Sequence, residues 1–267
     1  MFPKLFTLSD FYTQHTYGVL VALALLVGIY TAGRFAPRAG LPRDTVWNVG
    51  VYMALAGLLG AKLFLVVSEW RFYSENLGQL FTLSTLNAGG VFQGGLLFAV
   101  AVVIVYAWRN KLDFSSLGDV YAPGLALGHV FGRLGCFSAG CCWGKPADVP
   151  WAVTFTNPYS AKIVGVPLGI PLHPTQLYEA LVEAAIFGLL VLLWRRRSFP
   201  GQIFASYLML YAAARFVIEF YRGDPRGAAF FEGALSLPQV LSVGLFVAAS
   251  LFWVWQRRHP LAPDHAG

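Results

Sequence analysis

The sequence predicts an all-α integral membrane protein, a bundle of seven transmembrane helices. Its 267 residues are 57% hydrophobic and only 12% charged, which lies outside the range of ordinary soluble domains. Apolar stretches of nearly membrane-spanning length recur along the whole chain. They are too long for barrel strands, and helices satisfy their own backbone groups in lipid. Residues 1–267 are therefore predicted to form a single integral membrane domain.

Seven stretches approach the roughly 20 apolar residues that a helix needs to cross the hydrocarbon core. The first stretch lacks a basic segment before it and a small-residue cleavage site after it. We therefore expect it to remain as the first span, because a secretory signal peptide carries both features. The predicted spans are 17–33, 46–67, 91–108, 117–137, 174–194, 201–221 and 236–255.

The basic residues indicate the orientation of these spans, because Lys and Arg are retained in cytoplasmic loops. They follow the first, third, fifth and seventh spans, which places the N-terminus outside and the C-terminus in the cytoplasm. The net charge of +6 is thus a topology signal and does not indicate nucleic-acid binding. The residues are Arg34, Arg38, Arg43, Arg109, Lys111, Arg195, Arg196, Arg197, Arg257 and Arg258.

The connections at residues 68–90 and at about 138–173 are external in this topology. The second is the longest in the chain and is rich in Gly and Pro. Such a composition favours a folded loop at the membrane surface over a further span.

Two arginines lie toward the outer ends of predicted spans, Arg133 in the fourth and Arg215 in the sixth. A charged group within a span is costly unless it has a partner or a function. Two guanidinium groups at one outer-leaflet pocket suit a phosphate, which each binds bidentately. Alternatively, Arg215 and Glu219 neutralise each other as a purely structural pair. Helical spacing places Tyr211, Arg215, Glu219 and Arg222 on one side of the sixth span.

Further polar groups gather at the start of the fifth span, where Pro174 is favourable as a first helical residue. Helix capping explains Pro174 and Thr175 but not the hydrogen-bonding side chains beside them. Before the third span, glycines flank Gln93 and predict the close approach of a neighbouring helix or a lipid head group. The candidate binding residues of these two segments are His173, Gln176, Tyr178, Glu179, Gly94 and Gly95.

The three cysteines, Cys136, Cys141 and Cys142, lie within seven residues of one another. Three interpretations are open. First, the three thiols are free and behave as small apolar side chains. Second, Cys136 forms a disulfide with Cys141 or Cys142 in an oxidising external compartment. Third, the thiols form a metal or redox site with His129 or His173. The spacing matches no standard zinc pattern, so the sequence predicts neither a metal nor a cofactor.

Taken together, these motifs resemble the prolipoprotein diacylglyceryl transferase family. The matching pieces occur in the family's order over nearly the full length of the chain, with the same seven spans and orientation. They are Tyr17-Gly18, Gly94-Gly95-Leu96, Gly132-Arg133-Leu134-Gly135 with Phe137 and Trp143-Gly144, His173-Pro174-Thr175-Gln176-Leu177-Tyr178-Glu179, Arg215-Phe216, Glu219-Phe220 and Arg222.

The resemblance implies transfer of diacylglycerol from phosphatidylglycerol to a lipobox cysteine thiol of a lipoprotein precursor, with release of glycerol phosphate. The implied partners are this anionic phospholipid, the precursor peptide and the lipid bilayer, without nucleic acid. The implied location is a bacterial inner (plasma) membrane, with the active site facing the periplasm or cell exterior. Arg133 and Arg215 would stabilise the leaving phosphate. The other implied substrate-binding residues are Tyr17, Gly94, Gly95, Gly135, Cys136, Gly144, His173, Gln176, Tyr178, Glu179, Tyr211, Glu219 and Arg222.

The sequence departs from the family at three positions. Gln93 stands where the family carries a His, and an amide cannot accept a proton at any useful pH. Cys136 and Cys141 replace an Asn and an acidic residue. In a transferase, His129, His173 or a thiolate would then supply the base missing at the catalytic position 93. The alternative is a non-catalytic or repurposed member that acts as a lipid-binding or thiol-redox membrane protein.

Overall fold

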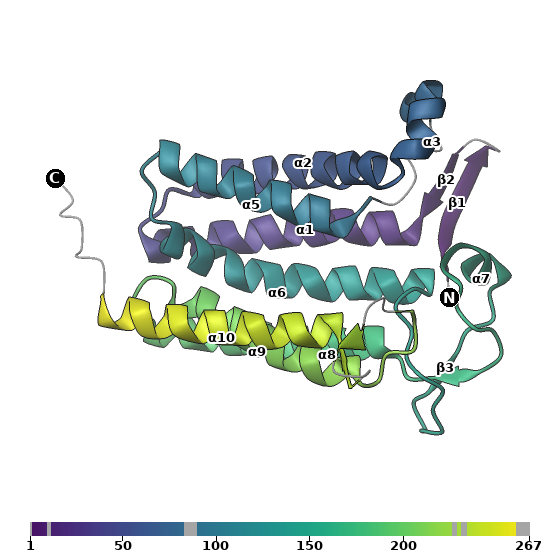
Figure 1. Ribbon diagram of the computed structural model, residues 1–267. Helices are drawn as coiled ribbons and strands as arrows, with labels where there is room; N and C mark the ends of the chain where they lie inside the picture. The colour runs from purple at the N-terminus through teal and green to yellow at the C-terminus, as the bar shows by residue number, and fades with distance from the viewer. Residues whose placement is uncertain (1, 10–11, 83–89, 226–228, 231–233, 260–267) are drawn as a thin grey trace. The chain divides into compact units, whose positions relative to one another are not determined.

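The computed structural model describes residues 2–9, 12–82, 90–225, 229–230 and 234–259 (Figure 1). Long helices dominate these residues, and one helix coincides with each of the seven predicted spans. Helix boundaries differ from the predicted ones by a few residues, because frayed ends are not encoded in hydropathy. The helices are α1 (Thr16–Phe35), α2 (Arg43–Ser68), α5 (Phe92–Arg109), α6 (Phe114–Ala139), α8 (Thr175–Leu193), α9 (Gln202–Glu219) and α10 (Leu237–Arg258).

Five helices among the described residues are long and apolar enough to cross a membrane. The helical fold and these five candidates agree with the predicted membrane protein. Helices α6 and α9 do not meet the same measure, and both carry buried charged side chains. The count of seven spans and the orientation of the termini remain predictions. The five candidates are Thr16–Ala39, Arg43–Ser68, Phe92–Arg109, Thr175–Arg196 and Leu237–Arg258.

Shorter elements connect the long helices, and they include strand pairs that the all-α prediction did not contain. The connection predicted at 138–173 is folded around a small buried core of Trp143, Phe155, Val166 and Leu172. Residues 83–89 of the other connection lie outside the described residues. The antiparallel pairs are β1 (Lys4–Ser9) with β2 (Tyr12–His15), β3 (Val153–Thr154) with β4 (Pro171–Leu172), and β5 (Ala229–Phe230) with β6 (Leu235–Ser236). The short helices are α3 (Trp70–Glu75), α7 (Pro158–Val164) and the 3₁₀ helices η1 (Ala36–Ala39), η2 (Leu77–Phe81) and η3 (Trp194–Arg196).

The chain divides into two compact units. The smaller unit, residues 33–117, is built on the packing of α2 against α5. A Cβ atom on Gly94 would meet the Phe64 side chain, and one on Gly95 would lie 2.9 Å from the Gly57 carbonyl oxygen. Both glycines therefore allow a close approach of two helices. The prediction of a single membrane domain for the whole chain remains a prediction.

The larger unit comprises residues 1–32 and 118–267. Within it α9 packs against both α8 and α10 (Figure 1). Helices α1 and α6 approach closely, because a Cβ atom on Gly124 would meet the backbone oxygen of Gly28. This unit contains every charged residue of the site described below.

A buried carboxylate on α6 holds the beginning of α9. Asp119 is 0% exposed; its Oδ2 accepts hydrogen bonds from Gly201 N (2.8 Å) and Arg197 Nε (2.7 Å). Its Oδ1 accepts one from Phe204 N at 2.8 Å. The first N–H groups of a helix have no partner within the helix, and the residue preceding α9, Gly201, has no side chain to cap them. Asp119 thus fixes α9 against α6.

We predict that Asp119→Ala destabilises the protein by about 3–5 kcal/mol, because it removes the buried carboxylate that accepts hydrogen bonds from Arg197 and from the backbone N–H groups of Gly201 and Phe204. Thermal unfolding in detergent micelles measures the effect. Asp44→Ala, at an exposed position in the first turn of α2, is the control and is expected to change stability by about 0.5 kcal/mol at most. Equal effects of the two substitutions would contradict the anchoring role.

Candidate functional site

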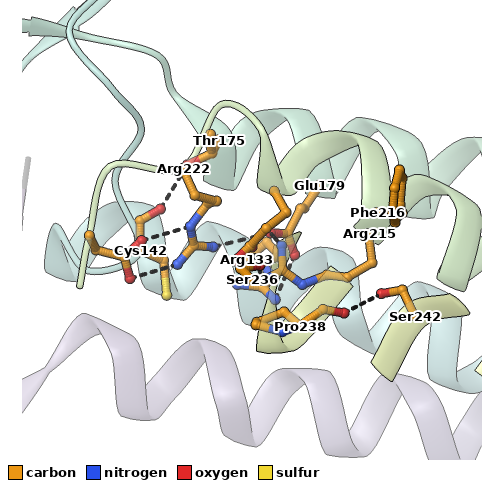
Figure 2. A network of polar contacts seen from close by, with 12 residues as sticks. Arg133, Cys142, Thr175, Glu179, Arg215, Phe216, Arg222, Ser236, Pro238 and Ser242 are labelled. Atoms are coloured by element: carbon orange, nitrogen blue, oxygen red, sulfur yellow. Dashed lines mark hydrogen bonds and ion pairs between the residues drawn. The ribbon is translucent and has the colours of Figure 1, made fainter. Parts of the chain in front are cut away.

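Three guanidinium groups converge on the carboxylate of Glu179, in the first turns of α8 (Figure 2). Arg133 Nη2, from α6, lies 2.5 Å from Oε2. Arg215 Nη1, from α9, and Arg222 Nη1, from the segment after α9, donate to Oε1 at 3.3 and 3.2 Å. The structure therefore brings the two arginines that the sequence predicted for phosphate binding onto one buried carboxylate.

Two further carboxylates complete the charge balance of this cluster. Glu219 accepts hydrogen bonds from Arg215 Nη2 at 2.6 Å and from Ser236 Oγ at 3.0 Å. Asp224 forms a bidentate pair with Arg222, with Nε and Nη2 at 2.8 and 2.9 Å from its oxygens. The structural pair of Arg215 and Glu219 thus exists, but as one part of a network of three cations and three anions.

The three guanidinium groups differ in the donors that they retain. Arg222 is 1% exposed, and its three nitrogens all bond to Glu179 or Asp224. Arg133 is 15% exposed, and its Nη1 forms no hydrogen bond to any described residue. Arg215 is 9% exposed, and its Nε likewise has no partner among those residues. Arg133 and Arg215 can therefore bind an added anion, whereas Arg222 is committed to the network.

His129 orients Arg133. Its Nε2 accepts a hydrogen bond from Arg133 Nε at 3.0 Å, and its Nδ1 lies 2.8 Å from Glu183 Oε1. Because Nε2 is an acceptor, the ring proton is on Nδ1 and is donated to Glu183. Both nitrogens are thus occupied, and no lone pair of His129 remains to remove a proton from a substrate.

A small cavity lies beside this network, lined by Glu179, Glu183, Tyr211 and Arg215 among others. Its volume of about 10 Å³ accommodates at most one water molecule. The Tyr211 ring contacts His129, with their centroids 5.6 Å apart. Tyr211 therefore lies beside the network, and its substrate-binding role remains a prediction, because a lipid head group needs more space than this cavity provides.

The other predicted base, His173, belongs to an aromatic cluster. Its Nδ1 lies 3.0 Å from the hydroxyl of Tyr178, which accepts a hydrogen bond from Trp151 Nε1 at 2.7 Å. The His173 ring also packs edge-on against Tyr221 at 5.1 Å. Within the described part of the chain, no hydrogen bond or ion pair joins His173 or Tyr178 to the three arginines. These two predicted residues are therefore not part of the charged network.

The three cysteines lie together where α6 ends. Cys136 is in the last turn of the helix, and the chain then turns back through Gly140 and Cys142, whose φ angles are +84° and +65°. All three thiols are free, and their sulfur atoms lie within 4.8 Å of one another. Gln176 Nε2 donates to the Cys141 carbonyl at 2.7 Å, so this predicted site residue holds the thiol-bearing turn.

The two thiols that follow the end of α6, those of Cys141 and Cys142, differ in the direction in which their pKa is shifted. Hydrogen bonds from Cys136 and Cys141 lower the pKa of the Cys142 thiol, and the Arg222 guanidinium lowers it further. The pKa of Cys141 is raised because its proton is held in hydrogen bonds to the other two thiols. Burial lowers the pKa of Arg222, but its hydrogen bonds to Asp224 and its attraction to Cys142 outweigh this, so that its pKa is raised overall.

Gly144 and Gly135, which were both predicted to bind substrate, allow close packing at the site. A Cβ atom on Gly144 would meet the His173 backbone and would lie 2.8 Å from the Tyr221 carbonyl oxygen. Gly144 also forms a backbone bridge with Arg222, so it helps to position that arginine. A Cβ atom on Gly135 would lie 3.2 Å from Cδ2 of Tyr17, which places the Tyr17 ring against α6, one residue before Cys136.

Gln93 lies on α5 in the smaller unit, and its side chain is exposed. Its catalytic role, and the substrate-binding roles of Gly94 and Gly95 beside it, remain predictions.

Roles for Glu183, Asp224 and Ser236 were not predicted from the sequence. Signals for two of them were present, since Glu183 follows Glu179 by one helical turn and Asp224 follows Arg222 by two residues. Ser236 also begins α10, where it forms a capping box with Gln239. The sequence at Ser236 is typical of a helix cap, and it does not predict the contact of Ser236 with Glu219.

The family model described as prolipoprotein diacylglyceryl transferase matches residues 3–255. Three similar proteins bear the name "Phosphatidylglycerol--prolipoprotein diacylglyceryl transferase". The protein of Finegoldia magna is 30% identical over 93% of both chains. Those of Clostridium tetani and Geobacillus kaustophilus are 32% and 33% identical over 92% of this chain, and over 96% and 89% of their own lengths.

We predict that Glu179→Gln destabilises the protein by about 3 kcal/mol or more, because three buried guanidinium groups lose the anion that they share. Chemical unfolding of the protein in mixed micelles provides the measurement. The matched control is Glu69→Gln, at an exposed position, with an expected effect of about 0.5 kcal/mol at most. If Glu179→Gln proves as stable as the control, Glu179 does not hold the network together.

Proposed function

The chain belongs to the prolipoprotein diacylglyceryl transferase family and is a membrane transferase of lipoprotein biogenesis, and we propose that it moves diacylglycerol from phosphatidylglycerol to a precursor's lipobox cysteine. One observation carries the proposal: Arg133 and Arg215, on separate helices, meet at Glu179 and still retain donors for an anion. The similar proteins are named for the same two substrates.

The proposed reaction places growing negative charge at the arginines. The acceptor sulfur forms a bond to the glyceryl carbon while the bond from that carbon to the phosphate oxygen breaks. The electron pair remains on the phosphate, which leaves as glycerol phosphate, and the acceptor thiol loses its proton. Guanidinium groups that are already fixed in place stabilise such a leaving group without reorganisation. Glu179, Glu219 and His129 supply this fixation for Arg133 and Arg215.

The exposure of the guanidinium groups supports Arg133 as the first contact of the head group. Arg133 retains Nη1 and is more exposed than Arg215 or Arg222. The cavity beside Arg215 is too small for a phosphate, so the phosphate is proposed to bind Arg133 first and to reach Arg215 as the cavity opens. In the predicted orientation this site lies at the outer ends of α6 and α9, facing the periplasm or cell exterior.

We predict that Arg133→Lys lowers the rate of diacylglyceryl transfer by about 10²–10³-fold, because lysine keeps the charge but loses the planar fork of donors. The rate is measured with purified protein, phosphatidylglycerol vesicles and a lipobox peptide. Arg109→Lys, at an exposed position at the end of α5, is the matched control and should retain the wild-type rate. A normal rate for a folded Arg133→Lys protein would remove Arg133 from the reaction.

The proposed substrates are tested in bacteria depleted of their own transferase. The wild-type chain is expected to restore growth and diacylglyceryl-modified lipoprotein, detected by mass spectrometry. Absence of the modification, with the protein correctly inserted in the membrane, would refute the proposed acceptor.

A further inference from the structure

We propose that Cys136, Cys141 and Cys142 form a three-thiolate binding site for Zn²⁺ that leaves the fourth coordination position open. The three sulfur atoms lie within 4.8 Å of one another. Tetrahedral zinc with Zn–S bonds of about 2.3 Å requires sulfur atoms about 3.8 Å apart. Small side-chain rotations therefore suffice to close the site around an ion.

The backbone explains how this spacing forms a site although it matches no standard zinc pattern. Adjacent residues in an extended chain point to opposite sides, which would separate the thiols of Cys141 and Cys142. Cys142 instead has a φ of +65°, a left-handed conformation that only a few per cent of non-glycine residues adopt. This conformation brings both sulfur atoms to the side on which Cys136 lies.

Two buried side chains hold this turn rigidly. Gln176 Nε2 donates to the Cys141 carbonyl at 2.7 Å, and Thr175 Oγ1 donates to the Cys142 carbonyl at 2.8 Å. Both side chains are 0% exposed and belong to the first turn of α8. The backbone of both cysteines is thus fixed before an ion binds, as a metal site requires.

The charges near the cluster favour bound zinc over the apolar alternative. Three thiolates and one Zn²⁺ carry a net charge of −1. Cys142 interacts electrostatically with Arg222, which lies beside it in Figure 2, and with Arg133. A disulfide would pair only two of the three thiols and leave the third beside these cations. A metal site uses all three.

The role of the open position rests on the proposed transferase function. The acceptor thiol would bind zinc as a thiolate, and its proton would be released to water, because coordination deprotonates a thiol outright. The zinc-bound sulfur then forms the bond to the glyceryl carbon as the carbon–oxygen bond to phosphate breaks. This step requires no basic side chain, which accords with Gln93 in place of a histidine and with the two occupied nitrogens of His129.

Metal binding is tested on the full-length protein in detergent, with its thiols reduced. We expect one Zn²⁺ per chain by elemental analysis, and sulfur-to-metal charge-transfer absorption when Co²⁺ replaces it. Cys136→Ser, Cys141→Ser and Cys142→Ser should each weaken Zn²⁺ binding at least about 10-fold, whereas the control Ser138→Ala should not. The wild-type result alone is decisive: if the reduced protein binds neither ion, or binds Co²⁺ without sulfur ligation, the site does not exist.

The role is tested separately by removing the metal with a chelator and measuring diacylglyceryl transfer to a lipobox peptide. We expect at least a 10-fold loss of rate and its recovery on adding Zn²⁺. An unchanged rate in the metal-free protein overturns the role of zinc while the site stands. Zinc-loaded protein that shows the expected Co²⁺ spectrum but transfers no diacylglycerol refutes the transferase proposal, and with it the role, but not the site.

Discussion

The carboxylate of Glu179 is the constraint on which the rest of the site depends. Charged side chains within membrane spans are costly, and three arginines can be buried together only if anions compensate them. Glu179 contacts all three arginines, while Glu219 also pairs with Arg215 and Asp224 also pairs with Arg222. Helices α6, α8 and α9 are thereby held in one arrangement by a single shared charge.

The arginines of this network differ in the nitrogen atoms that they leave without a hydrogen bond. All three guanidinium nitrogens of Arg222 form hydrogen bonds within the network, and its backbone bridge with Gly144 joins the chain after α9 to the segment that follows the cysteines. Arg133 and Arg215 retain donors that the folded residues do not use. At the other end of α9, Asp119 holds the helix against α6. The two arginines that we propose bind the phosphate thus lie between two fixed points.

Much of the helical fold follows from the sequence, because long apolar stretches predict where helices lie, although not the residues at which they begin and end. The pairing of Arg215 with Glu219 was predictable, since residues four apart share a helix face. The convergence of Arg133 on Glu179 was not, because it depends on how α6 packs against α8. The clustering of the thiols depends on the left-handed backbone at Cys142. The sequence does not predict this conformation, because residues other than glycine rarely adopt it.

The proposed zinc site gives the three departures from the family pattern a common explanation. A glutamine replaces the family histidine, and cysteines replace an asparagine and an acidic residue. Cys136 lies in the last turn of α6, three residues beyond Arg133, and the sulfur atoms of Cys141 and Cys142 lie within 4.8 Å of its own, so a chain that lacks the histidine carries three thiols close to the arginine that we propose binds phosphate. In this interpretation the arginines stabilise the leaving phosphate and the thiol cluster activates the acceptor sulfur.

An experimental structure with phosphatidylglycerol bound is the most direct measurement of how the arginines are used. The head-group phosphate is predicted to lie within hydrogen-bond distance, about 3 Å, of Arg133, while Arg222 remains bound to Asp224. A phosphate bound elsewhere, with Arg133 still held only by Glu179 and His129, would contradict the account.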